Sequence, residues 1–129
     1  MLDQKKLGQL RQRLLRRLDE VRTDIRRELR KYDNETYGEL ADRVADAGEQ
    51  SVADLLVDLD LAEVDRDVGE CREIEAALLR LADGSYGSCV DCEEPIEAQR
   101  LENSPAVPRC YGCQQRFEHR DREVHHRTL

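Results

Sequence analysis

The stretch that decides the fold is Cys89-Val-Asp-Cys92, followed after seventeen residues by Cys110-Tyr-Gly-Cys113. Two residues between the cysteines of each pair allow both sulfur atoms to reach one metal ion at about 2.3 Å. A connection of this length lets the two pairs face each other across a short hairpin. The spacing therefore predicts a four-cysteine zinc ribbon.

The competing interpretation of these cysteines is a pair of disulfides. The chain has five cysteines, an odd number, and it begins Met1-Leu2-Asp3-Gln4-Lys5-Lys6, without the apolar stretch of a secretory signal. Both observations favour zinc and a cytoplasmic protein. Four thiolates fill the tetrahedron and leave no open position for water or substrate, so we expect one zinc ion with a structural role.

The composition points to solvated helices rather than to a compact enzyme. Of the 129 residues, 39% are charged, and the aromatic residues are one Phe, four Tyr and no Trp. Such a chain cannot build a large aromatic core. We therefore expect long amphipathic helices, and a metal ion where the chain is too small to fold unaided.

The charges are unevenly distributed along the chain. Residues 1–31 carry eleven basic and five acidic side chains, whereas residues 32–70 carry two basic and thirteen acidic ones. Proteins that bind DNA normally show a basic footprint, and the net charge here is −8. We therefore expect no sequence-specific DNA binding.

Apolar residues at steps of three and four predict two long helices. The second is expected to start at Gln50 or Ser51, to show a phase slip near Asp60, and to end at Asp83-Gly84, because glycine is favoured just past a helix end. The first seam is Leu7, Leu10, Leu14, Leu18, Val21, Ile25, Leu29 and Tyr32. The second is Val52, Leu55, Leu56, Leu59, Leu61, Val64, Val68, Cys71, Ile74, Leu78 and Leu81.

The two helices are expected to form an antiparallel coiled-coil hairpin over residues 1–83, with a turn near Ala47-Gly48 and an acidic tip near 42–51. Opposite charges on the helices support this pairing. The basic residues are Arg16, Arg17, Arg26, Arg27, Arg30 and Lys31, and the acidic ones Asp54, Asp58, Asp60, Glu63, Asp65 and Asp67. We expect a monomer, although the seam would equally suit a dimerisation coil.

Residues 84–129 are predicted to form the zinc-binding unit. Pro95, Pro105 and Pro108 break the stretch between the cysteine pairs into short extended pieces and turns, and a C-terminal helix begins at Tyr111 or soon after. No internal repeat and no transmembrane segment is found in the sequence. The predicted fold is mainly α.

One run of residues resembles the zinc-finger signature of the DksA/TraR family of bacterial transcription regulators. It reads Tyr86-Gly87-x-Cys89-x-x-Cys92-x-x-Pro95-Ile96-x-x-x-Arg100-Leu101-Glu102-x-x-Pro105, then Cys110-x-x-Cys113-Gln114. The likeness is close over residues 85–118, and the predicted hairpin extends it over nearly the whole chain. Glu93 departs from the family, which usually has a glycine there, often at positive φ.

The resemblance implies binding to RNA polymerase, with the coiled coil entering the secondary channel and its tip approaching the active-site magnesium. A gap-free count from Cys89 places the family's tip motif, Asp-x-x-Asp-x-Ala, on Asp46, Glu49 and Ser51. The same count places a polymerase-contacting arginine of the channel rim on Arg66. The resemblance thus implies a regulator with an acidic tip and a basic docking residue.

The resemblance also bears on guanosine tetraphosphate. Alarmone-responsive relatives carry basic residues where this chain has Glu73, Ser104 and Gln114. None of these can supply a cation for phosphate. We expect no binding of the alarmone at that site.

Other reactive residues are expected to be structural or exposed. Cys71 lies in the apolar phase of the second helix and is expected to pack rather than to bind metal. His119, His125 and His126 are expected on the surface of the C-terminal helix.

Two other functional classes compete with a polymerase regulator. A zinc ribbon that binds nucleic acid would need a basic face, but five acidic residues and two arginines lie between Cys89 and Cys113. A thiol-based redox-responsive zinc protein stays open as an alternative. Catalysis is not expected, because no nucleophile–base pair, open metal site or phosphate-binding loop is visible.

Overall fold

The computed structural model describes residues 2–127, and the side chains of residues 2–123. This part of the chain is mainly helical and contains no strand, apart from one isolated bridge between Ser88 and Pro95. The helices are α1 (Gln4–Arg30), α2 (Glu35–Ala45), α3 (Val52–Leu55), α4 (Ala62–Asp83), α5 (Ala98–Asn103) and α6 (Tyr111–Arg127). The predicted mainly α fold is confirmed.

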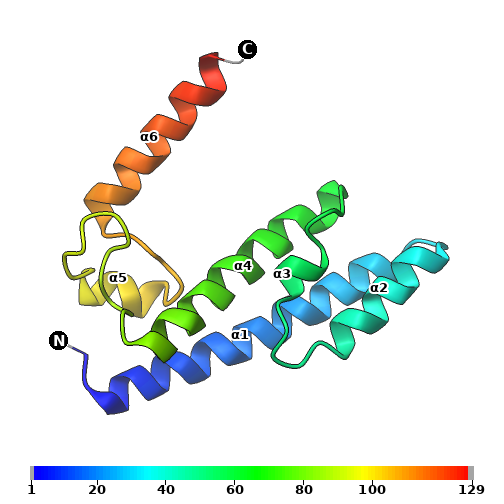
Figure 1. Ribbon diagram of the computed structural model, residues 1–129, viewed down its shortest axis with the longest axis horizontal. Helices are drawn as coiled ribbons and strands as arrows, with labels where there is room; N and C mark the ends of the chain where they lie inside the picture. The colour runs from blue at the N-terminus through cyan, green and yellow to red at the C-terminus, as the bar shows by residue number, and fades with distance from the viewer. Residues whose placement is uncertain (1, 128–129) are drawn as a thin grey trace.

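The helices α1 and α4 pack side by side in opposite directions and form what we call the shaft (Figure 1). Each helix buries one stripe of side chains, as the steps of three and four predict. In α1 these are Leu10, Leu14, Leu18, Val21, Ile25 and Leu29. In α4 they are Val64, Val68, Cys71, Ile74 and Ala77. The predicted antiparallel hairpin is thus confirmed as the pairing of α1 with α4.

Local signals define the ends of the shaft near the termini of the chain. The Asp3 carboxylate accepts a hydrogen bond of 2.8 Å from the backbone N–H of Lys6, which caps the start of α1. At the end of α4, Gly84 adopts φ 83°, a left-handed conformation that glycine tolerates without steric cost. The predicted stop at this glycine is confirmed.

The predicted turn near Ala47-Gly48 between two long helices is wrong. The chain already turns at residues 31–34, and α2 then runs back along α1 (Figure 1). The Asn34 side chain caps α2 by accepting a bond of 3.1 Å from the N–H of Tyr37. Folding back allows α2 to bury Ala41 and Val44 against the shaft. The predicted first long helix is therefore divided into α1 and α2.

The second predicted helix is also interrupted. Ser51 does act as an N-cap, since its hydroxyl accepts a bond of 3.0 Å from the N–H of Asp54, but the helix that it starts, α3, ends at Leu55. An irregular stretch follows, and α4 begins at Ala62. The phase slip expected near Asp60 therefore marks a break in the helix.

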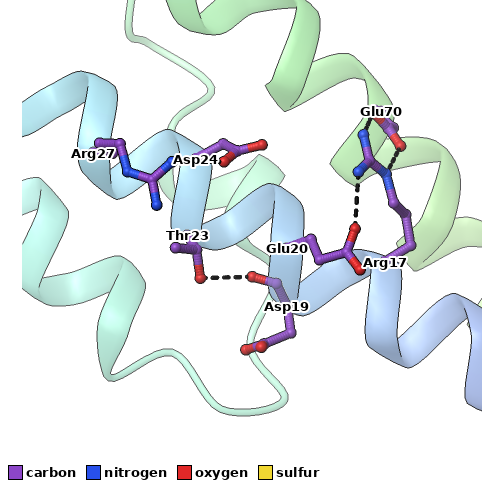
Figure 2. A network of polar contacts seen from close by, with 7 residues as sticks. All are labelled: Arg17, Asp19, Glu20, Thr23, Asp24, Arg27 and Glu70. Atoms are coloured by element: carbon purple, nitrogen blue, oxygen red, sulfur yellow. Dashed lines mark hydrogen bonds and ion pairs between the residues drawn. The ribbon is translucent and has the colours of Figure 1, made fainter.

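The ion pairs between α1 and α4 involve other acids than those predicted. Arg17 donates from Nε and Nη2 to both carboxylate oxygens of Glu70, at 2.5 and 2.9 Å, and from Nη1 to Glu20 (Figure 2). This fork holds the pKa of the Glu70 carboxyl below its usual range. The other pair joins Arg22 to Glu75. None of the acids predicted to face α1 forms an ion pair with it in the described part of the chain.

The N-terminal end of α1 contacts the segment that follows α4. Lys6 and Arg13 form ion pairs with Glu102 of α5, and Leu2 packs beside Gly87. The Tyr86 hydroxyl donates to the carbonyl of Pro105 at 2.8 Å. Contacts thus cross the predicted boundary between residues 83 and 84. Within the described residues, no helix is both long and apolar enough to traverse a bilayer.

Truncation in the α1 stripe is expected to weaken the hairpin far more than truncation on its surface. Ile25 is fully buried, whereas Leu79 of α4 is 69% exposed. We expect Ile25→Ala to lower the free energy of unfolding by about 2–5 kcal/mol, because it leaves a cavity. Leu79→Ala should change it by about 0.5 kcal/mol or less. Urea unfolding followed by circular dichroism measures both; equal losses would contradict this description of the core.

Candidate metal centre

The first cysteine pair lies on a tight loop after α4. The backbone N–H of Cys89 donates to the carbonyl of Glu94 at 2.8 Å, and that of Glu93 donates to the carbonyl of Cys89 at 2.9 Å. Glu93 adopts φ 65° and is the one non-glycine residue at positive φ in the described part of the chain. A glycine would adopt this conformation more easily, so Glu93 adds some local strain to this loop.

The second cysteine pair lies where the chain enters α6. The N–H of Gln114 donates to the carbonyl of Cys110 at 2.9 Å, which continues the helix, and the N–H of Cys113 points to the Cys110 sulfur at 3.5 Å. A backbone bond of 3.0 Å from Val90 to Pro108 holds the two loops together. The predicted start of the C-terminal helix at Tyr111 is confirmed.

The structure brings all four predicted ligands together. The sulfur atoms of Cys89, Cys92, Cys110 and Cys113 lie within 4.8 Å of one another, and the Cys92 and Cys110 sulfurs are 3.9 Å apart. A tetrahedral ion bound at about 2.3 Å requires sulfur atoms about 3.8 Å apart. Four thiolates are also a donor set that zinc prefers. The geometry and the chemistry both fit a structural zinc ion.

Hydrogen-bond donors lie around the sulfur atoms, and at Cys89 they favour the thiolate form. Burial alone would raise the pKa of the Cys89 thiol, but the backbone N–H groups of Cys92, Cys110 and Asp91 lower the pKa to about 6. On the other side, Arg116 of α6 donates from Nη2 to the Cys113 sulfur at 3.1 Å. Such donors spread the negative charge of the ligands and fix their orientation.

A small apolar cluster packs around the cysteines. Its buried members are Cys89, Ile96, Leu101 and Cys113, with Leu2, Tyr86, Val107 and Cys110 at the edge. Leu101 belongs to α5, a helix that the prolines on either side led us to miss. The signal was present in Ala98-Gln99-Arg100-Leu101-Glu102, a run of good helix formers.

Arg109 connects the first cysteine loop to α6. Its Nε donates to Asp91 at 2.7 Å, and its guanidinium lies 4.0 Å from the centre of the Phe117 ring. Arg100 of α5 donates to the carbonyl of Arg109 at 2.9 Å. These contacts fix the direction in which α6 leaves the metal centre.

The residues predicted to form the hairpin tip lie instead beside the middle of α1. Asp46 and Glu49 are exposed, but the carbonyls of Gly48 and Gln50 accept hydrogen bonds from Arg22 at 2.7 and 3.0 Å. The Ser51 hydroxyl donates to Glu75 of α4 at 2.7 Å. The end of the shaft is formed by residues 31–34 and 56–61 (Figure 1). In this conformation, residues 42–51 do not form the tip of the hairpin.

Of the other predicted residues, Arg66 is exposed on α4 and forms no ion pair with the described residues. Glu73 and Ser104 line one groove of about 530 Å³, in which Arg13, Arg16 and Arg17 of α1 face Glu20 and Glu70. Gln114 lies elsewhere and donates to Glu118 at 3.1 Å.

Cys71 is buried in the shaft, away from the four-cysteine cluster, as predicted. Burial, followed by the nearby Glu75 carboxylate, raises the pKa of this thiol to about 12, so it stays protonated. His119 lies on the surface of α6 near Glu123, at 3.1 Å. His125 and His126 lie outside the residues whose side chains are described.

Comparisons with known proteins agree with this architecture. The prokaryotic dksA/traR C4-type zinc finger matches residues 84–119. The RNA polymerase-binding transcription factor DksA of Caulobacter vibrioides is 31% identical over 123 residues, which cover 94% of this chain and 82% of that protein. The chain belongs to the DksA/TraR family. The resemblance found in the sequence is thereby confirmed.

Two further members of the family are similar over different lengths. The RNA polymerase-binding transcription factor DksA of Haemophilus influenzae is 35% identical over 66 residues, which cover 51% of this chain and 46% of that protein. The structure of transcription factor DksA2 from Pseudomonas aeruginosa superposes with a TM-score of 0.60 at 29% identity. That superposition covers 93% of this chain and 88% of the DksA2 chain.

The four-cysteine cluster is expected to hold one zinc ion per chain. Zinc contributes on the order of 10–16 kcal/mol in comparable small sites, so its removal by a chelator should unfold the metal centre and leave much of the shaft helical. Cys113→Ser should lose the ion, whereas Cys71→Ala, which removes the thiol outside the cluster, should retain it. Elemental analysis and circular dichroism measure these results. A folded, reduced protein without bound metal would contradict the assignment.

Proposed function

We propose that this protein is a non-enzymatic bacterial transcription regulator that binds RNA polymerase through the secondary channel, without reading a DNA sequence. The observation that carries the proposal is the match over 94% of the chain to a protein named an RNA polymerase-binding transcription factor. The helical hairpin and the four-cysteine centre, which account for most of this chain, support it. The working compartment would be the cytoplasm, where that polymerase is found.

In this proposal, the metal ion fixes the positions of α4, α6 and the start of α1 relative to one another. Cys89, Cys92, Cys110 and Cys113 bind one zinc ion, which closes the loop between α4 and α6 and carries no reaction. Because Leu2, just before α1, and Lys6 of α1 contact the same region, the ion also supports the base of the hairpin. The zinc centre thus orients the shaft for docking.

The shaft is the element that we propose to enter the polymerase. With 27 residues in α1 and 22 in α4, it is about 33–40 Å long at a rise of 1.5 Å per residue. Residues 32–70, which comprise the helices α2 and α3 that lie against the shaft and the start of α4, carry thirteen acidic and two basic side chains. This charge favours a cationic channel or a magnesium site over DNA, which would be repelled.

Arg66 is proposed to dock at the rim of the channel, and Asp46, Glu49 and Ser51 to act near the active site. The exposed guanidinium of Arg66 has no ion pair within the described residues, so its five donors are available to a partner. Asp46 and Glu49 are proposed to act through their charge and not to hold the protein on the polymerase. Substitutions at these acids and at Arg66 should therefore affect activity and binding separately.

Variants of the two regions should therefore behave differently. Arg66→Ala should weaken binding to core RNA polymerase by about tenfold or more, because arginine is often a hot spot in interfaces. Arg72→Ala, an exposed arginine on the same helix, is the matched control and should bind normally. Asp46→Asn combined with Glu49→Gln should bind but lose effect in initiation assays. Competition binding measures the first result, and wild-type behaviour of Arg66→Ala would refute its docking role.

The alarmone guanosine tetraphosphate is proposed not to bind at the family site of this protein. The Glu73 carboxylate and the neutral Ser104 side chain line the same groove, and Gln114 is hydrogen-bonded to Glu118. A carboxylate repels phosphate, and neither of the other two side chains supplies a cation. Of the three arginines in the groove, Arg13 and Arg17 are already paired with acids.

With a polymerase that lacks other alarmone sites, guanosine tetraphosphate should therefore add little to the effect of this protein on transcription. Glu73→Lys should increase the response, because it replaces a negative side chain of the groove with a positive one. Strong synergy between the alarmone and the unmodified protein would overturn this expectation.

A further inference from the structure

Residues 35–55, which we call the folded-back segment, lie against the shaft and comprise α2, the loop 46–51 and α3 (Figure 1). Two short connections join the segment to the shaft, residues 31–34 after α1 and residues 56–61 before α4. Both lie at the same end of the shaft (Figure 1). Since α2 and α3 also contact each other, the segment can move as a unit about this pair of connections.

A half-buried polar cluster holds the loop of this segment on the shaft. Arg22 donates to the carbonyls of Gly48 and Gln50 at 2.7 and 3.0 Å. Glu75 accepts from the Ser51 hydroxyl at 2.7 Å and from the N–H of Val52 at 2.8 Å. Arg22 and Glu75 are 3.8 Å apart, and each side chain is 16% exposed. Partial burial strengthens these charged hydrogen bonds, so the cluster serves as a latch.

The segment buries apolar residues such as Ala41, Val44 and Val52 in the core of the hairpin, but its other polar contacts are weaker or incomplete. The ion pair of Arg30 with Asp42 is exposed, and such pairs contribute little. The Nε groups of Arg22 and Arg26 are buried and have no hydrogen-bond partner among the described residues. Buried donors without partners destabilise the conformation that contains them. The loss of a few polar contacts is therefore expected to shift the equilibrium away from the closed arrangement.

A continuous helical path through the connections requires changes in only a few backbone angles. Lys31, just past α1, already has helical angles of φ −67° and ψ −24°, whereas Asn34 is extended at φ −143° and ψ 119° and caps α2. Leu61, which precedes α4, is also extended and provides no side-chain cap. Helical angles across 32–34 and 56–61 would join α1 to α2 and α3 to α4.

The joined helices would form a longer hairpin with the loop 46–51 at its end. The loop now lies beside Arg22. In the joined arrangement it would lie more than twenty residues farther along the helix, which is more than about 30 Å at a rise of 1.5 Å per residue. Asp46 and Glu49 would then be the leading acidic residues of the hairpin. The steps of three and four along the sequence suit both arrangements.

We propose that the folded-back segment is a hinged arm with a latch at Arg22 and Glu75. The structure is its closed state, in which Asp46 and Glu49 lie against the shaft. Opening carries them to the end of the hairpin. The consequence for transcription rests on the proposed function, since only the open state would bring these acids toward the polymerase active site.

A distance between labels tests the hinge directly in the full-length, zinc-bound protein. Spin labels on keto-bearing unnatural residues at Gln9 and Glu49, both exposed, leave every cysteine unchanged. In the closed state the labels should be about 20 Å apart, and in the open state about 55 Å, from the helical rise. Pulsed electron spin resonance resolves these distances.

Two variants weaken different parts of the closed state. Arg22→Met keeps the length of the side chain but removes three hydrogen-bond or ion-pair contacts, and should raise the ratio of long to short distances about tenfold or more. Asn34→Ala removes the cap of α2 and should raise the ratio about fivefold. Arg27→Met is the control and should change nothing, because among the described residues Arg27 pairs only with Asp24 of its own helix.

The outcomes separate this proposal from the function on which it depends. If both variants keep zinc and helicity but show the short distance alone, the hinge is refuted; if Arg22→Met does not fold, Asn34→Ala decides. Addition of core RNA polymerase should shift the unmodified protein to the long distance. Binding at the short distance would refute opening on docking. If the variants show the long distance but the protein does not bind core RNA polymerase, the hinge is supported and the proposed function is refuted.

Discussion

The buried stripe of α1 is the constraint on which the rest of the hairpin depends. Its residues Val21, Ile25 and Leu29 are fully buried, and α1 contacts α2 as well as α4. A chain with one Phe and no Trp has few other large side chains to bury. One helix therefore serves as the common support of α2 and α4, and this is why the folded-back segment can add to the core without a core of its own.

The metal centre also contains few apolar residues, and here a metal ion rather than a helix would provide the stabilising contacts. Its cluster consists mainly of Ile96, Leu101 and two of the cysteines themselves, which is too little to order the loops around it. A zinc ion would replace the missing apolar contacts with four strong bonds. Arg109 and Arg116 then relate α6 to the cysteine loops, one through Asp91 and Phe117 and the other through the Cys113 sulfur. The spacing of the four cysteines thus brings the loops and α6 together in this chain.

Polar contacts decide the conformation where apolar contacts leave a choice. The alternation of apolar and polar residues suits a long hairpin and a folded-back one, because both bury the same faces of the helices. The Arg22 and Glu75 side chains, by contrast, have their hydrogen-bond partners in the loop 46–52 only when the segment is folded back. Half-buried charges are destabilising without partners, so a few hydrogen bonds can determine the arrangement.

The features that could be predicted from the sequence are those set by neighbours along the chain. The spacing of Cys89, Cys92, Cys110 and Cys113 implied the metal cluster, Gly84 implied the end of α4, and Ser51 implied a helix start, because each depends on backbone geometry within a few residues. The turn at residues 31–34 and the partners of Arg17 and Arg22 depended on tertiary structure. Periodicity is the same in one helix or two, and long charged side chains reach several acids at similar energies, so only the packed chain selects among them.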